Sequence, residues 1–144
     1  MDNKLVEVFS GLDVFLRNPT EYIQGKNLGL VVNHTSLTKN YIHSIVHLKN
    51  MNDCEVVKLF APEHGLYGVD QDMAEGPDAK DPISGLTVES LYGKDLSSLT
   101  PDIKAFKGID PLLFDVQDIG ARYYTFIYTM ANCMKVCKEA GVRL

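Results

Sequence analysis

Four short strand-like runs, separated by segments with helical spacing, most constrain the fold of this chain. They cover residues 28–32, 55–60, 86–91 and 111–116, and each ends in polar or turn-forming residues. Short continuous apolar runs are typical of strands that are covered on both faces, as in a parallel sheet. Strands that alternate with helices pair in parallel through right-handed crossovers. The sequence therefore predicts an α/β domain with a mostly parallel sheet.

The segments around these runs carry apolar residues at helical spacing. Residues 3–17 predict an amphipathic helix that ends at Asn18-Pro19, and residues 42–48 predict a second helix. A short helix or turn is expected within 103–109, and a longer helix is expected from Tyr123 to a stop at Gly141. Residues 141–144 resemble the beginning of a fifth strand, so the sheet is expected to be truncated before its last strands.

Size and charge narrow the class of protein. The 144 residues suffice for one domain with a modest core. The formal charge is -5 and Lys and Arg form no stripe, which argues against nucleic acid as a partner. No apolar segment approaches the roughly 20 residues that cross a bilayer. The N-terminus lacks the layout of a signal peptide, so the chain as written predicts a cytoplasmic protein without a membrane partner.

Polar side chains follow each predicted strand. Because the carboxyl ends of parallel strands meet at one edge, where the loops line a crevice, these side chains are expected to form a common site. After the first two strands they are Asn33, His34, Thr35 and Ser36, then Glu63 and His64. After the other two they are Tyr92, then Asp115, Gln117, Asp118 and Arg122. Tyr123 and Tyr124 follow this edge and can stack on a sugar, although a core role is expected for one of them.

Glu63 lies on a stiff turn, Pro62-Glu63-His64-Gly65. Neighbouring carboxylates raise the pKa of a carboxyl group, so Asp115 and Asp118 would suit Glu63 to act as a general acid. The alternative is that Glu63 only binds backbone amides of its turn. His64 can be a base, a metal ligand or a hydrogen-bonding wall, and the wall is favoured. His43 and His47 are expected to lie away from this edge.

Several common motifs are absent. The chain has no G-x-G-x-x-G after a strand and no G-x-x-x-x-G-K-[ST], so no nucleotide cofactor is predicted, and it has no G-x-S-x-G elbow, so a serine hydrolase is not predicted either. A metal site is also not predicted, because adjacent Glu63 and His64 lack the i, i+4 spacing of helical zinc ligands. Cys54, Cys133 and Cys137 show no zinc spacing and are expected to be buried thiols.

Four ordered segments resemble the NamZ-type exo-β-N-acetylmuramidases, a family of bacterial glycoside hydrolases. The segments are residues 29–35, 60–65, 90–93 and 114–125. The resemblance implies a Rossmann-like three-layer N-terminal domain whose cleft is shared with a second domain. It also implies the release of terminal N-acetylmuramic acid from peptidoglycan fragments, with Glu63 as the catalytic carboxylate.

The remaining site residues follow from the same motifs and from the strand ends. The second catalytic group is Asp115, Asp118 or a group beyond this chain, and the substrate's own acetamido group can also serve as nucleophile. The predicted substrate-binding residues are Asn33, His34, Thr35, His64, Tyr92, Gln117, Arg122 and Tyr123.

The resemblance also bears on domain organisation. Residues 1–144 are interpreted as an incomplete N-terminal domain, because similar proteins are much longer and carry a second domain. The chain alone is expected to be inactive or weakly active. The alternatives left open are a non-catalytic amino-sugar-binding remnant and one part of a split enzyme, whose C-terminal domain is supplied in trans or by a homo-oligomer. Members of the family are often exported.

Overall fold

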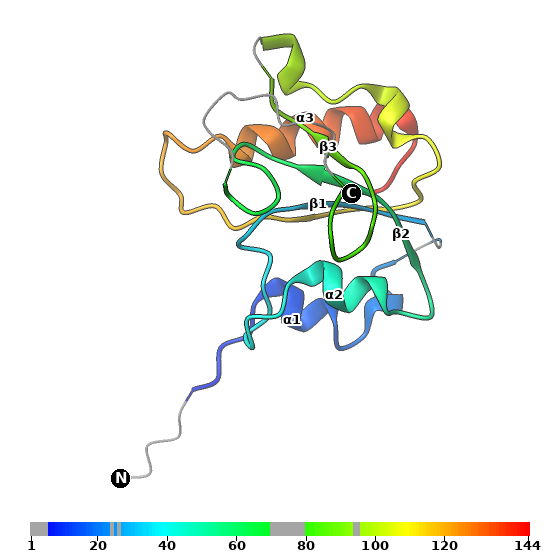
Figure 1. Ribbon diagram of the computed structural model, residues 1–144, viewed down its shortest axis with the longest axis vertical. Coiled ribbons are helices and arrows are strands. Elements are labelled where there is room, and N and C mark those ends of the chain that lie inside the picture. Colours follow the sequence, from blue (N-terminus) through cyan, green and yellow to red (C-terminus); the bar gives the residue numbers. More distant parts are fainter. Residues whose placement is uncertain (1–5, 24, 26, 70–79, 94–95) are drawn as a thin grey trace.

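The computed structural model describes residues 6–144 except 24, 26, 70–79 and 94–95. Four parallel strands form its sheet in the order β3-β2-β1-β4 (Figure 1). The strands are β1 (Asn27–Val32), β2 (Glu55–Ala61), β3 (Val88–Ser90) and β4 (Leu112–Asp115). Val31 of β1 lies opposite Phe60 on one side and Phe114 on the other. The predicted α/β class and the parallel pairing are confirmed.

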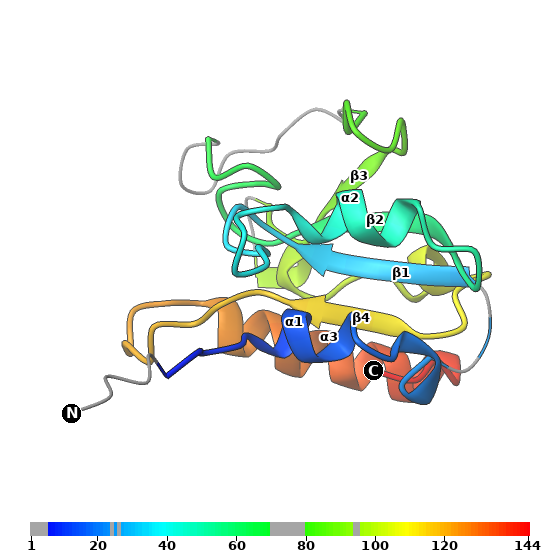
Figure 2. The same ribbon diagram turned by 90° about the horizontal axis from the view of Figure 1, so that it is seen from below.

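Helices cover both faces of the sheet, which gives three layers (Figure 2). The short helices α1 (Gly11–Phe15) and α2 (Ser44–Lys49) lie on one face, and α3 (Phe126–Ala140) lies on the other. Within the described ranges, three 3₁₀ helices occur in the connections, at Pro19–Glu21, Leu96–Leu99 and Ile103–Phe106. The Rossmann-like layering expected from the resemblance is therefore present.

Alternating side chains divide the core between the two faces. Leu28, Leu30 and Val32 pack with α2, whereas Val31 packs with Phe60 and the buried face of α3. The same alternation continues in β4, where Leu113 joins the α2 side and Phe114 joins the α3 side. Asp115 follows Leu113 by two positions, so its side chain points toward α1 and α2.

The first helix is much shorter than predicted. It begins at Gly11 because Ser10 and Asp13 form a capping box, in which Asp13 N donates to Ser10 Oγ and Ser10 N donates to Asp13. Val8, one of the apolar residues whose helical spacing predicted the longer helix, precedes this cap and is 79% exposed, so its place in that spacing does not reflect burial. Residues 3–5 of the prediction lie outside the described residues.

The C-terminal part agrees better with the prediction, although α3 begins at Phe126 rather than Tyr123. Gly141 ends α3 in the left-handed conformation (φ 71°) expected of a helix stop. Arg143 then pairs in parallel with Pro111, and Leu112 N donates to Arg143 O at 2.8 Å. This pairing agrees with the predicted start of a fifth strand beside β4. The three cysteines are buried and reduced, as predicted.

The long connection between β2 and β3 is anchored where it is described. Tyr67 donates its hydroxyl to Asp81 Oδ1, and Ser84 Oγ donates to Asp81 Oδ2 at 2.6 Å. Asp81 is only 2% exposed, so these contacts hold the two ends of the connection together. The predicted functional loop at 66–85 includes residues 70–79, which lie outside the described residues.

None of the described helices is long and apolar enough to cross a membrane.

Candidate active site at the carboxyl edge of the sheet

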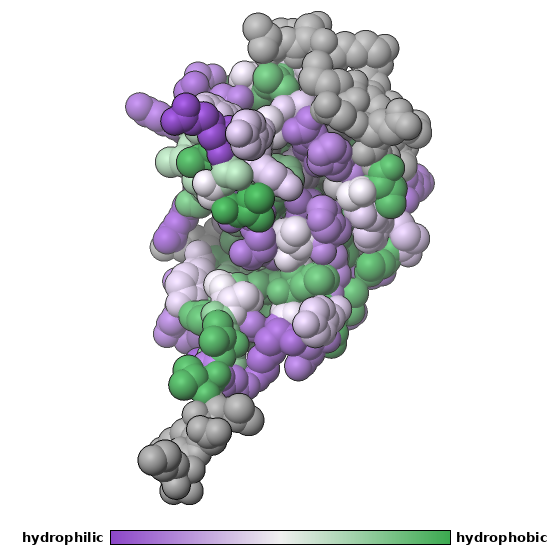
Figure 3. All heavy atoms as spheres, turned by 90° about the vertical axis from the view of Figure 1, so that its left-hand side faces the viewer, coloured by the Kyte–Doolittle hydropathy of each residue, from purple (hydrophilic) through white to green (hydrophobic). Residues whose placement is uncertain are grey.

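The predicted site residues follow the carboxyl ends of the four strands, and these ends lie at one edge of the parallel sheet. Asn33 follows β1, Glu63 lies two residues beyond β2, Tyr92 follows β3, and Asp115 ends β4. In Figure 3, which faces this edge, polar and apolar side chains are exposed side by side. The expected gathering of strand ends is thus observed. Individual side chains, however, point into different cavities.

Glu63 lines an open pocket of about 260 Å³ together with His64, Tyr123, Tyr124 and Phe126. The Glu63 carboxylate accepts a hydrogen bond from Thr125 Oγ1 at 2.7 Å. Tyr123 and Tyr124, which line the same pocket, are 92% and 43% exposed. The pocket therefore combines one acid, one imidazole and two phenol rings.

The turn that carries Glu63 has a backbone conformation that residues other than glycine rarely adopt. His64 has φ 70° and Gly65 has φ 76°, and Gly65 N closes the turn by donating to Pro62 O at 3.0 Å. A left-handed conformation at a non-glycine residue costs about 1–2 kcal/mol, and such residues cluster at functional sites. The turn presents Glu63 and His64 to the same pocket. Its cost is therefore consistent with a role in binding or catalysis.

Asn33 and Thr35 join the end of β1 to the segment that follows β4. Thr35 donates from N and Oγ1 to Asn33 Oδ1, at 2.9 and 2.6 Å, and Gln117 N donates to Thr35 Oγ1 at 3.0 Å. Ser36 Oγ also donates to the backbone oxygen of Asp115. Asn33 is 1% exposed, so it lies beneath the surface of the edge. Asn33 and Thr35 thus hold the backbone of the site in place.

His34 is exposed and packs against Gly68, whose φ is +71°. A Cβ atom at Gly68 would lie 2.5 Å from His34 Nδ1, so Gly68→Ala is expected to displace the His34 ring and to lower stability by about 2 kcal/mol. Gly120→Ala is the matched control, because Gly120 has φ +72° and open space at its Cβ. Urea unfolding and the NMR shifts of His34 check this prediction. Equal losses in the two variants would contradict it.

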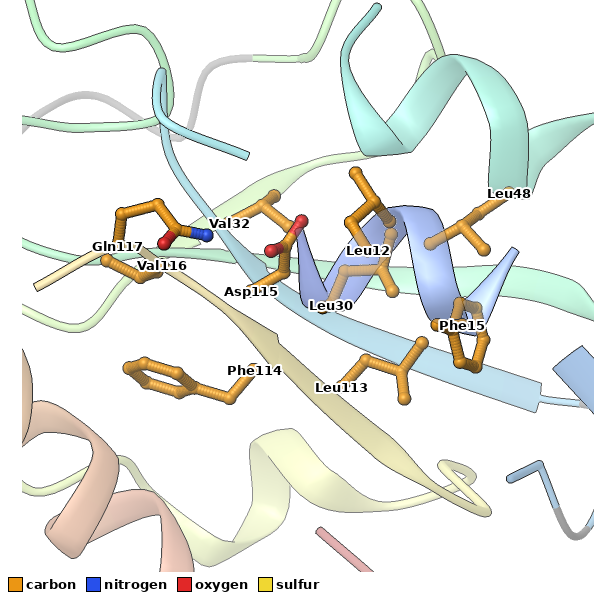
Figure 4. A pocket seen from close by; sticks show the side chains of 11 residues that line it. Leu12, Phe15, Leu30, Val32, Leu48, Leu113, Phe114, Asp115, Val116 and Gln117 are labelled. Carbon is orange, nitrogen blue, oxygen red and sulfur yellow. The ribbon is translucent and has the colours of Figure 1, made fainter. Parts of the chain in front are cut away.

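Asp115 lines a different cavity, of about 380 Å³, with α1, α2 and β4 (Figure 4). The walls are mainly apolar, and Asp115 lies at one end with Gln117, while Phe15 and Leu48 lie at the other. Burial raises the pKa of Asp115 to about 6, although the neighbouring side chain of Ser44 partly opposes the shift. Asp115 Oδ2 is buried without a hydrogen-bond partner among the described residues.

Asp115 and Glu63 therefore do not share a pocket. Asp115 faces α1 and α2, whereas Glu63 lies at the beginning of α3, on the other face of the sheet. The expectation that Asp115 sits beside Glu63 is not met, because the alternation of β4 turns Asp115 toward the other face of the sheet.

Asp118 and Arg122 lie on the exposed segment between β4 and α3. Asp118 Oδ1 accepts from Gly120 N at 2.6 Å, and no ion pair joins Arg122 to either aspartate in the part of the chain that the structure describes. Tyr92 lines a smaller cavity of about 110 Å³, with Thr125 and Tyr128, beside the Glu63 pocket. No group of three or more His, Cys, Asp or Glu within the described ranges is arranged to hold a metal ion.

Comparison with known families assigns the chain. Residues 28–144 match the family model described as "Exo-beta-N-acetylmuramidase NamZ, N-terminal". The chain belongs to this NamZ N-terminal family. It is 37% identical over 139 residues to the peptidoglycan β-N-acetylmuramidase NamZ of Bacillus subtilis (strain 168). The aligned region is 96% of this chain and 33% of that protein.

Two crystal structures of DUF1343 family proteins from Bacteroides fragilis NCTC 9343 have similar folds. One has a TM-score of 0.80 and 34% identity, and the match covers 93% of this chain and 32% of the chain in that structure. The other has a TM-score of 0.64 and 26% identity, and the match covers 88% of this chain and 31% of the chain in that structure. The chain thus spans about a third of the length of these relatives.

Two residues of this NamZ N-terminal domain, Thr125 and His43, bear on the site but were not predicted to do so from sequence. Thr125 donates to Glu63. Tyr124 and Ser36 were expected at this edge, where Tyr124 lines the Glu63 pocket and Ser36 holds the backbone of Asp115. His43 was expected to lie away from the edge, and this was wrong. Its Nδ1 accepts from Ile45 N at 3.2 Å, so Nε2 carries the proton and donates to Asn33 O at 3.0 Å. Burial lowers the pKa of His43, consistent with this neutral form.

Proposed function

We propose that this chain provides the wall that bears the catalytic carboxylate in a glycosidase releasing terminal N-acetylmuramic acid from peptidoglycan fragments. Membership of the NamZ N-terminal family and the 37% identity to a peptidoglycan β-N-acetylmuramidase support this assignment. The observation that carries it is the placement of Glu63 in an open pocket between His64 and two exposed tyrosines.

Glu63 is the proposed catalytic carboxylate. Most glycosidases use a pair of Asp or Glu carboxyl groups that flank the glycosidic bond, and in substrate-assisted enzymes the substrate's acetamido group takes the place of one of them. The rings of Tyr123 and Tyr124 offer apolar faces on which a sugar ring can stack, while His64 offers a polar contact. Arg122, exposed on the same loop as Tyr123, supplies a cation for the lactyl carboxylate of muramic acid.

The second reactive group is proposed to be Asp118, the acetamido group of the substrate, or a residue outside this chain. Asp118 is exposed on the loop that leads to Tyr123, whereas Asp115 faces the opposite side of the sheet. Asp115 is therefore the weaker of the two aspartate candidates. Asn33 and Thr35 contribute by holding residues 115–117, and their own contact with substrate is not required.

The chain spans about a third of its relatives, so the opposite wall of the cleft is proposed to come from a region outside it. Catalysis requires both the positioning of the substrate and the exclusion of water. We therefore expect negligible turnover by the 144-residue chain alone. The Glu63 pocket is open to solvent, which is consistent with this expectation.

A chromogenic N-acetylmuramic acid glycoside tests the proposal when it is incubated with the full enzyme, in which this chain is joined to the opposite wall of the cleft or meets it in trans. Release of the chromophore is expected, and the N-acetylglucosamine glycoside should react at least about tenfold more slowly because it lacks the lactyl carboxylate. The chain alone is assayed in parallel. Equal rates with the two glycosides, or no turnover of either, would refute the assigned substrate.

A further inference from the structure

Thr125 occupies the N-cap position of α3 but does not cap the helix with its side chain. An N-cap threonine usually accepts a hydrogen bond from the backbone of the first helical turn. Thr125 instead has the helical conformation (φ -94°, ψ -8°), and only its backbone oxygen serves the helix, by accepting from Tyr128 N at 2.9 Å and Thr129 N at 3.0 Å. Its hydroxyl is thereby available for another partner.

That partner is Glu63, 62 positions earlier in the sequence. Thr125 Oγ1 donates to Glu63 Oε2 at 2.7 Å, a length typical of a hydroxyl donating to a carboxylate. A donor that faces a carboxyl oxygen favours the ionised form of the acid. The contact also places the carboxylate at the first turn of α3, a fifteen-residue helix whose N-terminus carries positive partial charge.

Among the described residues, the other groups that line the pocket do not oppose this effect, and Asp118 is exposed and is not one of them. The lining residues of the pocket besides Glu63 are His64, Tyr123, Tyr124 and Phe126, which carry no negative charge near neutral pH. Asp115, which could have disfavoured ionisation through like charge, faces the other side of the sheet. Hydrogen bonding and the helix terminus therefore act in the same direction.

We propose that Thr125 is a positioning residue that keeps Glu63 ionised and fixes one of its carboxylate oxygens. Glu63 then enters the reaction as a proton acceptor or as a negative charge beside the sugar, rather than as the general acid that its sequence context suggests. This last step rests on the proposed glycosidase function. The effect of Thr125 on the ionisation of Glu63 does not.

An NMR pH titration of the Glu63 side-chain carboxyl carbon tests the proposal in the 144-residue chain. In the unmodified protein this carboxyl is expected to titrate below about 4.3, the value of an unperturbed glutamate. Thr125→Val should raise its pKa by about one unit, because it removes the donor while keeping the shape. Thr125→Ser, which restores a hydroxyl, should bring the pKa back toward that of the unmodified protein.

Thr129→Val is the matched control. Thr129 is a buried threonine one turn later, and its hydroxyl donates to Thr125 O at 3.3 Å. This variant should leave the titration of Glu63 unchanged. A pKa at or above 4.3 in the unmodified protein, or the same pKa in Thr125→Val, would overturn the proposal. The first criterion needs no variant, so it holds even if Thr125→Val fails to fold.

Kinetics of the full enzyme separate this proposal from the glycosidase function. If both hold, the acidic limb of the pH profile of kcat/KM should move upward in Thr125→Val by the same amount as the NMR pKa. An NMR shift without any glycosidase activity would sustain the role of Thr125 and reject the function. Activity with an unchanged pKa of Glu63 would do the reverse.

Discussion

Glu63→Gln is expected to lower kcat/KM for the chromogenic muramic acid glycoside by about 10³-fold, the range typical of losing a catalytic acid or base. Glutamine has almost the same shape as glutamate, and its amide oxygen can still accept the hydrogen bond from Thr125. It cannot take up a proton or carry the negative charge. The loss should therefore appear mainly in kcat, with KM changed little.

Glu89→Gln provides the comparison. Glu89 is on β3 and pairs with Lys58 at 3.7 Å, outside the Glu63 pocket, so removing its charge should leave kcat/KM within about twofold. Both variants should keep a melting temperature close to that of the unmodified protein. If Glu63→Gln retains more than a tenth of the original kcat/KM, Glu63 is not the catalytic carboxylate.

The sequence predicts the sheet well because its strands are buried on both faces. Leu28, Leu30, Val31 and Val32 are all fully buried, so a continuous apolar run was the correct signal for a parallel strand. Parallel pairing then places all strand ends at one edge, and the edge could be predicted without knowing the strand order. The predicted start of the first helix was wrong. The capping box at Ser10 begins the helix at Gly11, and Val8 before it is exposed although it fits the helical spacing.

The contacts of the site were harder to predict than its edge. The period-two alternation already places Asp115 on the same face as Leu113, but the sequence alone does not say that α3 and Glu63 lie on the other face. The sequence predicts a helix from Tyr123, so Thr125 is read there only as a residue of its first turn. Its contact with Glu63 depends on how α3 docks on the sheet, which no local pattern specifies.

Asp115→Asn is expected to stabilise the folded protein by about 2 kcal/mol at pH 8 and to have little effect at pH 4. Burial raises the pKa of Asp115 from its ordinary value of 3.8 to about 6, so the folded state holds this proton more tightly than the unfolded state does. Stability is then lost as the pH rises from about 4 to above 6, because the carboxyl must ionise in an apolar cavity. One pKa unit corresponds to about 1.4 kcal/mol, and partial exposure of Asp115 reduces the total.

Urea unfolding at the two pH values measures this difference, with Asp53→Asn as the control because Asp53 is exposed in the turn before β2. A gain of equal size at pH 4 and pH 8 would show that ionisation is not its cause.

The Asp115→Asn variant also separates two explanations for the presence of an aspartate at this position. If Asp115 only ends β4, its replacement by asparagine should leave kcat/KM intact. If turnover falls while stability rises, the protein tolerates an unfavourable charge at this position because the reaction needs it.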